Sequence, residues 1–121
     1  MSHLILDIIH CGNFVNQTDA IIYVMDALCS RYKLRVLNRY NYKFTPQGFT
    51  CVYTLAESHF TIHTHPEIYT ASIDLYSCRD MMYEMHDIAE ELVRRFNGEA
   101  KIKLIIKRTN VSAQLETLKI I

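Results

Sequence analysis

Residues 59–78, HFTIHTHPEIYTASIDLYSC, contain two short alternating stretches separated by a proline. Phe60 and Ile62 alternate with polar side chains in the first stretch, and Ile73 and Leu75 do the same in the second. Successive side chains of a β-strand point to opposite faces, so the pattern predicts two strands, each with one apolar and one polar face. The polar face carries histidines and a cysteine, which makes it the candidate functional surface.

Strand and helix patterns continue on both sides of these two strands. We expect further strands at residues 3–9, 34–44, 50–55 and 101–108, and amphipathic helices at residues 19–32 and 85–96. Thr18 is the expected N-cap of the first helix, and Asn97-Gly98 ends the second. Alternating lysines predict that residues 101–108 form an edge strand and the last one of the sheet.

The order of these elements predicts an α+β fold. Strands that follow one another closely favour antiparallel pairing, and two helices can cover only one face of the resulting sheet. We therefore expect a two-layer α/β sandwich, with a mainly antiparallel sheet and both helices on one face. The uncovered face must then meet solvent or a second copy of the chain, and the tyrosine-rich pattern favours a homodimer.

Length and composition indicate one globular domain over residues 1–121. Half of the residues are hydrophobic and 21% are charged, which is ordinary for a folded domain. The 13 basic side chains equal the 13 acidic ones in number, so no net charge favours nucleic acid or an anionic membrane, and we expect neither partner. No apolar run approaches the roughly 20 residues of a transmembrane helix.

The cysteines and the first residues indicate a cytoplasmic protein. The four cysteines lack any C-x-x-C spacing, which is typical of reduced, mostly buried thiols. The N-terminal stretch lacks the basic region and cleavage site of a signal peptide. The triplet that begins at Asn110 matches a glycosylation acceptor, and we expect this match to be fortuitous without a secretory signal.

Residues 57–67, ESHFTIHTHPE, allow several chemical interpretations. In the simplest one, the histidines are structural or exposed and have no chemical role. A second is a metal site formed by His63, His65 and Glu67, because histidines at positions i and i+2 share one side of a strand, although we expect no metal. A third is a serine hydrolase, which the absence of a G-x-S-x-G motif disfavours.

A fourth interpretation uses Glu57-Ser58 as one unit. The Ser58 hydroxyl attacks the preceding carbonyl and converts the amide to an ester, and removal of the serine Cα proton then breaks that ester. The new N-terminus becomes a pyruvoyl group, whose ketone forms a Schiff base with an amine and accepts electrons when CO2 leaves. Such chemistry requires a strained peptide, a donor to the oxyanion and a base, and Thr50 and His63 are candidates for the last two roles.

Three blocks of the sequence resemble, in order, those of the bacterial-type S-adenosylmethionine decarboxylase proenzymes. They are KFTPQG at 43–48, LAESHFTIHTHPE at 55–67 and ASIDLYSC at 71–78. The resemblance implies a zymogen that cleaves itself between Glu57 and Ser58. The products would be a β chain of residues 1–57 and an α chain of residues 58–121, which carries the pyruvoyl cofactor made from Ser58.

The same resemblance implies roles for individual side chains. Catalytic roles fall to Ser58, to His63 in the elimination step and to Cys78 as the proton donor after CO2 leaves, while Thr50 supports processing. Phe44 and Glu67 are implied to contact the adenine and the ribose of the substrate. The implied fold is a dimeric two-layer sandwich, and the implied product is the aminopropyl donor for spermidine and polyamine biosynthesis.

Departures from the family blocks lie around the substrate. His65 replaces a large aromatic residue, so we expect it to line the substrate site with less stacking area. Tyr69 stands where a glycine is usual, and Arg79 follows the cysteine where glycine is common. A pyruvoyl-dependent arginine or ornithine decarboxylase and a non-catalytic regulatory paralogue therefore remain alternatives, although Phe44 and Glu67 favour the nucleoside substrate.

Overall fold

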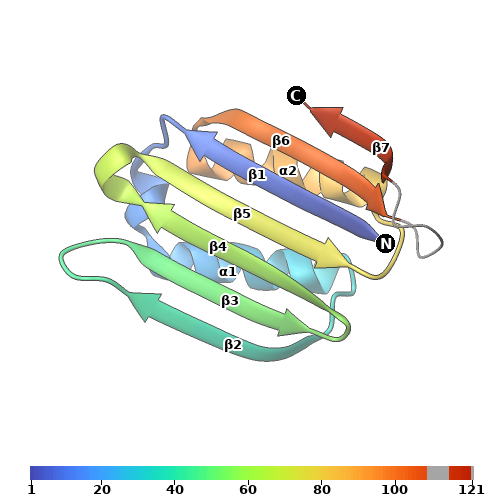
Figure 1. The fold of residues 1–121 in the computed structure, drawn as a ribbon. Helices are drawn as coiled ribbons and strands as arrows, with labels where there is room; N and C mark the ends of the chain where they lie inside the picture. The colour runs from blue at the N-terminus through green and yellow to red at the C-terminus, as the bar shows by residue number, and fades with distance from the viewer. Residues whose placement is uncertain (109–114, 121) are drawn as a thin grey trace.

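The computed structural model describes residues 1–108 and 115–120, and its strands form one seven-stranded sheet in the order β2-β3-β4-β5-β1-β6-β7 (Figure 1). All neighbouring strands are antiparallel. Their bounds are β1 Ser2–Ile9, β2 Val36–Lys43, β3 Phe49–Leu55, β4 Ser58–His65, β5 Thr70–Ser77, β6 Glu99–Arg108 and β7 Leu115–Ile120. Two short 3-10 helices, η1 (Asn13–Asn16) and η2 (Pro66–Ile68), lie in the connections.

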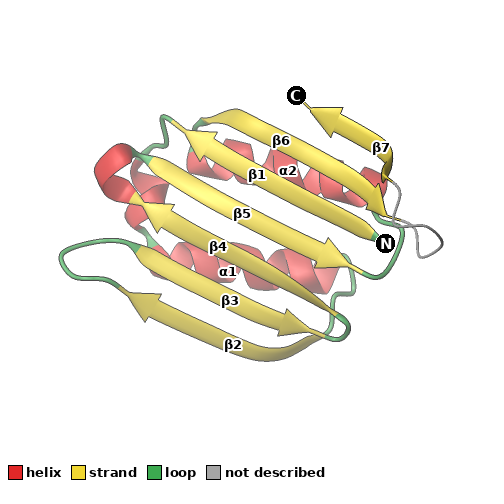
Figure 2. Cartoon of the chain, viewed as in Figure 1, coloured by secondary structure: helices red, strands yellow, loops and turns green. Residues whose placement is uncertain are grey.

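Two α-helices, α1 (Thr18–Arg31) and α2 (Met82–Phe96), cover the same face of this sheet (Figure 2). Burial alternates residue by residue along β1 and β5, so every second side chain enters the core between the two layers. The largest fully buried side chains include Tyr53, Phe49, Phe60 and Phe96. The predicted two-layer α+β sandwich is confirmed. None of the described helices has the length and apolar content needed to cross a bilayer.

Two details of the predicted fold are wrong. β6 is not an edge strand or the last strand, because it pairs with β1 on one side and with β7 on the other. Lys103 is buried on the same face of β6 as Ile105, so the alternating lysines indicated neither a solvent-facing row nor the absence of a neighbouring strand. Thr18 is the first residue of α1 and not its N-cap, which is Gln17, and no side chain caps this end. Asn110 lies outside the described residues.

A close contact with β1 determines how α2 ends. Asn97 adopts a left-handed conformation with φ of 50° and stops the helix, as the sequence predicted. A Cβ atom added to the next residue, Gly98, would lie 2.6 Å from Ile8 Cγ2 and 2.6 Å from the carbonyl oxygen of Ile9. Only glycine therefore allows the chain to leave α2 so close to the central strand β1.

We predict that Gly98→Ala lowers the free energy of unfolding by about 1–3 kcal/mol, because the added methyl group must displace β1 backbone or the Ile8 side chain. Urea denaturation measures the change. Gly12→Ala is the matched control, since a Cβ atom there would have its nearest neighbour at 3.4 Å, an ordinary contact. An equal loss in both variants would show that the contact with β1 is not the reason for glycine at position 98.

Candidate active site

His59, Thr61 and His63 of β4 lie on the sheet face that the helices leave open, as the alternation predicted, whereas Thr64 is buried on the other face. On this face His63 is directly opposite Thr50 of β3 in the strand ladder. Thr50 Oγ1 lies 2.9 Å from His63 Nδ1, so the two residues are in hydrogen-bond contact. This contact holds the imidazole in one orientation, which a side chain that removes a proton needs.

The Glu57-Ser58 peptide bond lies where the turn between β3 and β4 ends. Leu55 pairs with Ser58, so Ala56 and Glu57 alone form the turn. Glu57 has a φ of 66°, in the left-handed region that costs a residue other than glycine about 1 kcal/mol or more. Ser58 Oγ lies 3.4 Å from the Ala56 carbonyl oxygen. The serine is thus bonded to main chain and not to a histidine, which does not favour a serine hydrolase.

Cys78 follows the end of β5 and reaches the same turn. Its thiol donates a hydrogen bond to the carbonyl oxygen of Glu57, with an Sγ to O distance of 2.8 Å. The side chain is exposed, so the thiol is also open to a small molecule. A donor at this oxygen polarises the carbonyl that the Ser58 hydroxyl would attack and stabilises negative charge that develops there.

The other three cysteines are structural thiols. Cys11, Cys29 and Cys51 are buried and unpaired. Burial raises the pKa of all three, to about 11 at Cys29 and to about 12 at Cys51. They therefore remain protonated near neutral pH, which agrees with the expectation of reduced, buried thiols.

A small cavity lies at the turn. Its volume is about 130 Å³, and Glu57, Ser58, Cys78 and the connection between α1 and β2 line it. Arg79 also lines the cavity, and its Nη2 donates to the carbonyl oxygen of Tyr32 at 2.8 Å. This hydrogen bond fixes the guanidinium at the cavity wall. Sites for small molecules usually have about 300–1,000 Å³. This cavity is therefore too small to hold a nucleoside-sized ligand by itself.

Ser58 and His63 lie near opposite ends of β4, and their side chains point to opposite faces of the sheet, because Ser58 alternates in phase with the buried Phe60 and Ile62. They are five positions apart, which corresponds to about 16 Å at about 3.3 Å per residue. The fold therefore brings Glu57, Ser58 and Cys78 together at one end of β4, and Thr50 and His63 together near the other. The serine, the histidine and the cysteine do not share one pocket within a single chain.

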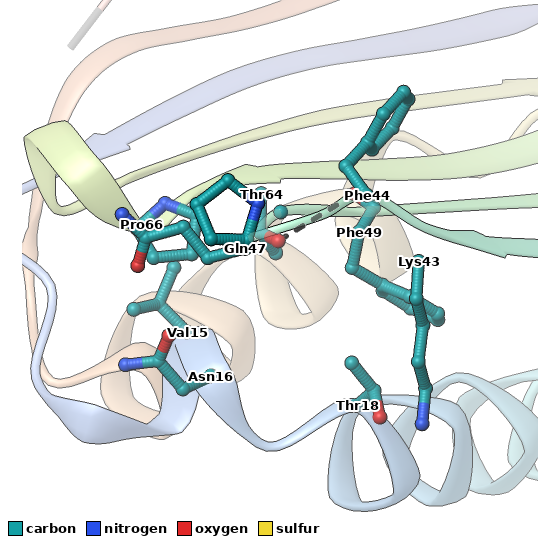
Figure 3. Close-up of a pocket in the computed structure, with 11 residues that line it drawn as sticks. Val15, Asn16, Thr18, Lys43, Phe44, Gln47, Phe49, Thr64 and Pro66 are labelled. Atoms are coloured by element: carbon teal, nitrogen blue, oxygen red, sulfur yellow. Dashed lines mark hydrogen bonds between the residues drawn. The ribbon is translucent and has the colours of Figure 1, made fainter.

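Phe44 lies at the His63 end, just after β2. Figure 3 shows its ring pointing away from Lys43, whose side chain is directed towards Thr18 and α1. The ring instead packs against Tyr42, with ring centroids 4.8 Å apart, and both side chains are about half exposed. A cavity of about 220 Å³ lies between the β2–β3 turn and α1, and the Phe44 ring points away from it. The exposed aromatic pair, and not this cavity, is the surface on which a base can stack.

His65 and Glu67 lie side by side at the start of η2, also at this end. His65 Nδ1 is 3.8 Å from Glu67 Oε1, and both side chains are about half exposed. Tyr69, which follows η2, has a φ of 52° and so adopts the left-handed conformation that glycine takes without strain. Within the described residues, His63, His65 and Glu67 do not form a three-ligand group, so this metal alternative gains no support.

Sequence reasoning missed a second polar cluster on the open face. His3 of β1, His59 of β4 and Asp74 of β5 converge there, with Asp74 Oδ1 2.7 Å from His3 Nε2 and 3.2 Å from His59 Nε2. The Tyr76 ring packs against both imidazoles. The alternating pattern placed His59 and Asp74 on polar strand faces, but it contained no signal for the register that brings His3 to them.

Comparisons with known proteins identify the family of this chain. The family model described as S-adenosylmethionine decarboxylase matches residues 2–109. An S-adenosylmethionine decarboxylase proenzyme of Clostridium kluyveri is 32% identical over 107 residues, which cover 88% of this chain and 84% of that protein. One from Clostridium botulinum (strain Loch Maree / Type A3) is 35% identical over 107 residues, which cover 87% of this chain and 91% of that protein.

A solved structure shows the same fold. The crystal structure of the adenosylmethionine decarboxylase from Aquifex aeolicus matches 96% of this chain and 96% of its own, with a TM-score of 0.76 at 22% identity. At this identity the structural likeness shows only a shared architecture. The matches to the family model and to the two proenzymes are likenesses of sequence. Because the family model spans nearly the whole chain and these relatives exceed 30% identity, the chain belongs to the S-adenosylmethionine decarboxylase family.

Proposed function

We propose that this chain is a proenzyme that cleaves itself between Glu57 and Ser58 and then decarboxylates S-adenosylmethionine. One observation carries the proposal: the Cys78 thiol donates to the carbonyl oxygen of Glu57, a residue held in a left-handed conformation next to Ser58. Membership of the family supports the substrate and the role of the product as an aminopropyl donor for polyamine synthesis. The four unpaired thiols support a reducing compartment such as the cytoplasm.

The chain's own groups perform the first steps. Ser58 Oγ adds to the Glu57 carbonyl carbon, and the Cys78 thiol stabilises the oxyanion while the peptide C–N bond breaks to leave an ester and a free amine. A base then removes the Ser58 Cα proton, and the Glu57 carboxylate leaves with its electron pair. The remaining dehydroalanine adds water and loses ammonia, which leaves a pyruvoyl ketone at the start of the α chain.

The base and its supporting hydroxyl come from a second copy of the chain. His63 is about 16 Å along β4 from Ser58, so it does not reach the Ser58 Cα atom of its own chain. Two copies that pack by their open faces about a twofold axis would bring the His63 end of one over the Ser58 end of the other. Exposed Tyr40, Tyr42 and Phe44 on β2 and just after it support such packing, because a soluble monomer rarely exposes a large apolar patch.

The same packing completes the substrate site. The small cavity at Ser58 would face the partner's Phe44, His65 and Glu67, which supply stacking area and a carboxylate for the nucleoside. The pyruvoyl group supplies a ketone that condenses with the substrate amine and accepts the electrons released when CO2 leaves. Cys78, exposed beside this group, then returns a proton to the substrate carbon.

The side chains around Ser58 bear on the alternative substrates. Lys33, Arg35 and Arg79 line the cavity there, and Glu57 is the only acidic residue among those that line it. A free basic amino acid needs an acidic partner for its distal cation, and the charges here do not favour arginine or ornithine. The positive side chains are suited to a carboxylate, which all three substrates carry next to the reacting carbon.

We predict that Ser58→Ala yields a single uncleaved chain with no activity, because the nucleophile and the source of the ketone are both removed. Denaturing mass spectrometry should show two fragments that meet at Glu57 and Ser58 in the unmodified protein and one mass in the variant. Release of labelled CO2 should occur with S-adenosylmethionine and not with arginine or ornithine. Normal cleavage of the variant would overturn the processing mechanism, and release from arginine would overturn only the substrate assignment.

His63→Ala alone should stop at the ester, which hydroxylamine would cleave, because the base is missing in both halves of the dimer. Co-expression with Ser58→Ala should restore cleavage of the His63→Ala chain, since the partner then supplies an intact imidazole. A small mass tag on one chain distinguishes the two variants. Absence of any cleaved His63→Ala chain in isolated mixed dimers would contradict an active site shared between copies.

Cys78→Ala should slow self-cleavage by about 10²–10³-fold, the usual effect of losing one oxyanion donor, and should abolish turnover in whatever fraction is cleaved. Cys78→Ser keeps a donor near the Glu57 carbonyl oxygen and should recover much of the cleavage rate. The time course of fragment formation measures the rate of processing, and CO2 release measures turnover. Equal processing rates in Cys78→Ala and the unmodified protein would remove the thiol from the first step.

A further inference from the structure

The strand register places His3, His59 and Asp74 close together on the open face. In the strand ladders, Tyr76 of β5 is opposite His59 of β4 on one side and opposite His3 of β1 on the other. The two histidines therefore form a row with Tyr76, and Asp74 lies two residues earlier on the same face of β5. Three adjacent paired strands hold the cluster, so it has a rigid base.

The distances in this cluster are close to those of a metal site. Asp74 Oδ1 lies 2.7 Å from His3 Nε2 and 3.2 Å from His59 Nε2, and all three ligand atoms lie within 4.8 Å of one another. Zinc bonds of about 2.0–2.2 Å in tetrahedral geometry separate neighbouring ligand atoms by about 3.3–3.6 Å. Sub-ångström to ångström movements of side chains on fixed strands would therefore create three bonds to one ion.

The surroundings allow an ion to enter. In a single chain the exposed fractions of the side chains are 20% at His3, 44% at His59 and 43% at Asp74, so the cluster is open on one side before two copies pack by their open faces. Tyr76 packs against both imidazoles, with ring centroids 5.7 Å away in each case, and partly shields them from water. Among the described residues, the cluster differs in this way from the His10–Glu99 pair, which is 74% and 70% exposed and has no third ligand.

One cation lies near the cluster and opposes the binding of an ion. The Arg108 guanidinium lies 5.1 Å from the centroid of the Tyr76 ring. Within the described part of the chain, the ion-pair partners of Asp74 are the two histidines and not this arginine. The charge of Arg108 therefore weakens the attraction of the cluster for a cation, without occupying the carboxylate.

We propose that His3, His59 and Asp74 bind a divalent ion of the zinc class, with solvent or a group of the second copy completing its coordination. Two imidazoles and one carboxylate form a ligand set that suits Zn²⁺, Co²⁺ and Ni²⁺ better than Mg²⁺ or Ca²⁺, which prefer oxygen ligands. Bonds to the ion replace the two contacts between histidine Nε2 and Asp74 Oδ1, so each imidazole then carries its proton on Nδ1. This site does not rest on the self-cleavage proposed above, because none of its ligands takes part in it.

Zinc titration of untagged protein stripped with a chelator tests the proposal. We expect one Zn²⁺ per chain by elemental analysis after gel filtration, and binding weakened about tenfold or more in His3→Ala and in Asp74→Asn. Arg108→Gln should bind more tightly. Co²⁺ should give the visible absorption of a site with nitrogen ligands in the unmodified protein and lose it in both ligand variants.

His10→Ala is the matched control, because it removes a histidine with one carboxylate partner outside the cluster. It should keep full binding. Failure of the unmodified protein to retain zinc, or equal retention by Asp74→Asn, would overturn the site and leave a hydrogen-bonded triad. Fragment masses measured on the same samples report self-cleavage separately, so loss of one proposal is distinguishable from loss of the other.

Discussion

The antiparallel pairing of β4 with β5 is the constraint on which the rest of this molecule depends. Because side chains alternate between faces, burying Phe60, Ile62, Ile73 and Leu75 under the helices forces every intervening polar residue onto the open face. The pairing also brings Cys78, which follows β5, to the turn where β4 begins. The strand pairing that forms the core therefore also places the reactive groups.

The two ends of β4 are chemically different. At one end the Cys78 thiol donates to the carbonyl oxygen of the left-handed Glu57, next to Ser58. At the other, Thr50 orients His63, and exposed aromatic residues and a carboxylate surround them. A rigid β-strand keeps the two ends apart, so His63 does not reach Ser58 within one chain.

A fixed framework also accommodates Arg79 and Tyr69, two positions where the sequence is expected to depart from the family blocks. Arg79 donates to a main-chain carbonyl of the α1–β2 connection and so becomes part of the cavity wall. Tyr69 accepts the left-handed backbone that glycine would adopt more easily, at a cost of about 1 kcal/mol that the large core offsets. Both changes lie in connections, where they alter the rim of the site without disturbing the strand register.

The sequence by itself determined the two-layer sandwich and the open polar face, and it predicted a scissile bond between Glu57 and Ser58, because hydrophobic period and local motifs are properties of neighbouring residues. It did not determine that β6 is an interior strand, that Ser58 and His63 lie far apart, or that His3 meets His59 and Asp74. Those facts depend on strand order and register. Both follow from which strands pair with one another in the sheet. Only the tertiary structure decided them, since pairing partners come from opposite ends of the chain.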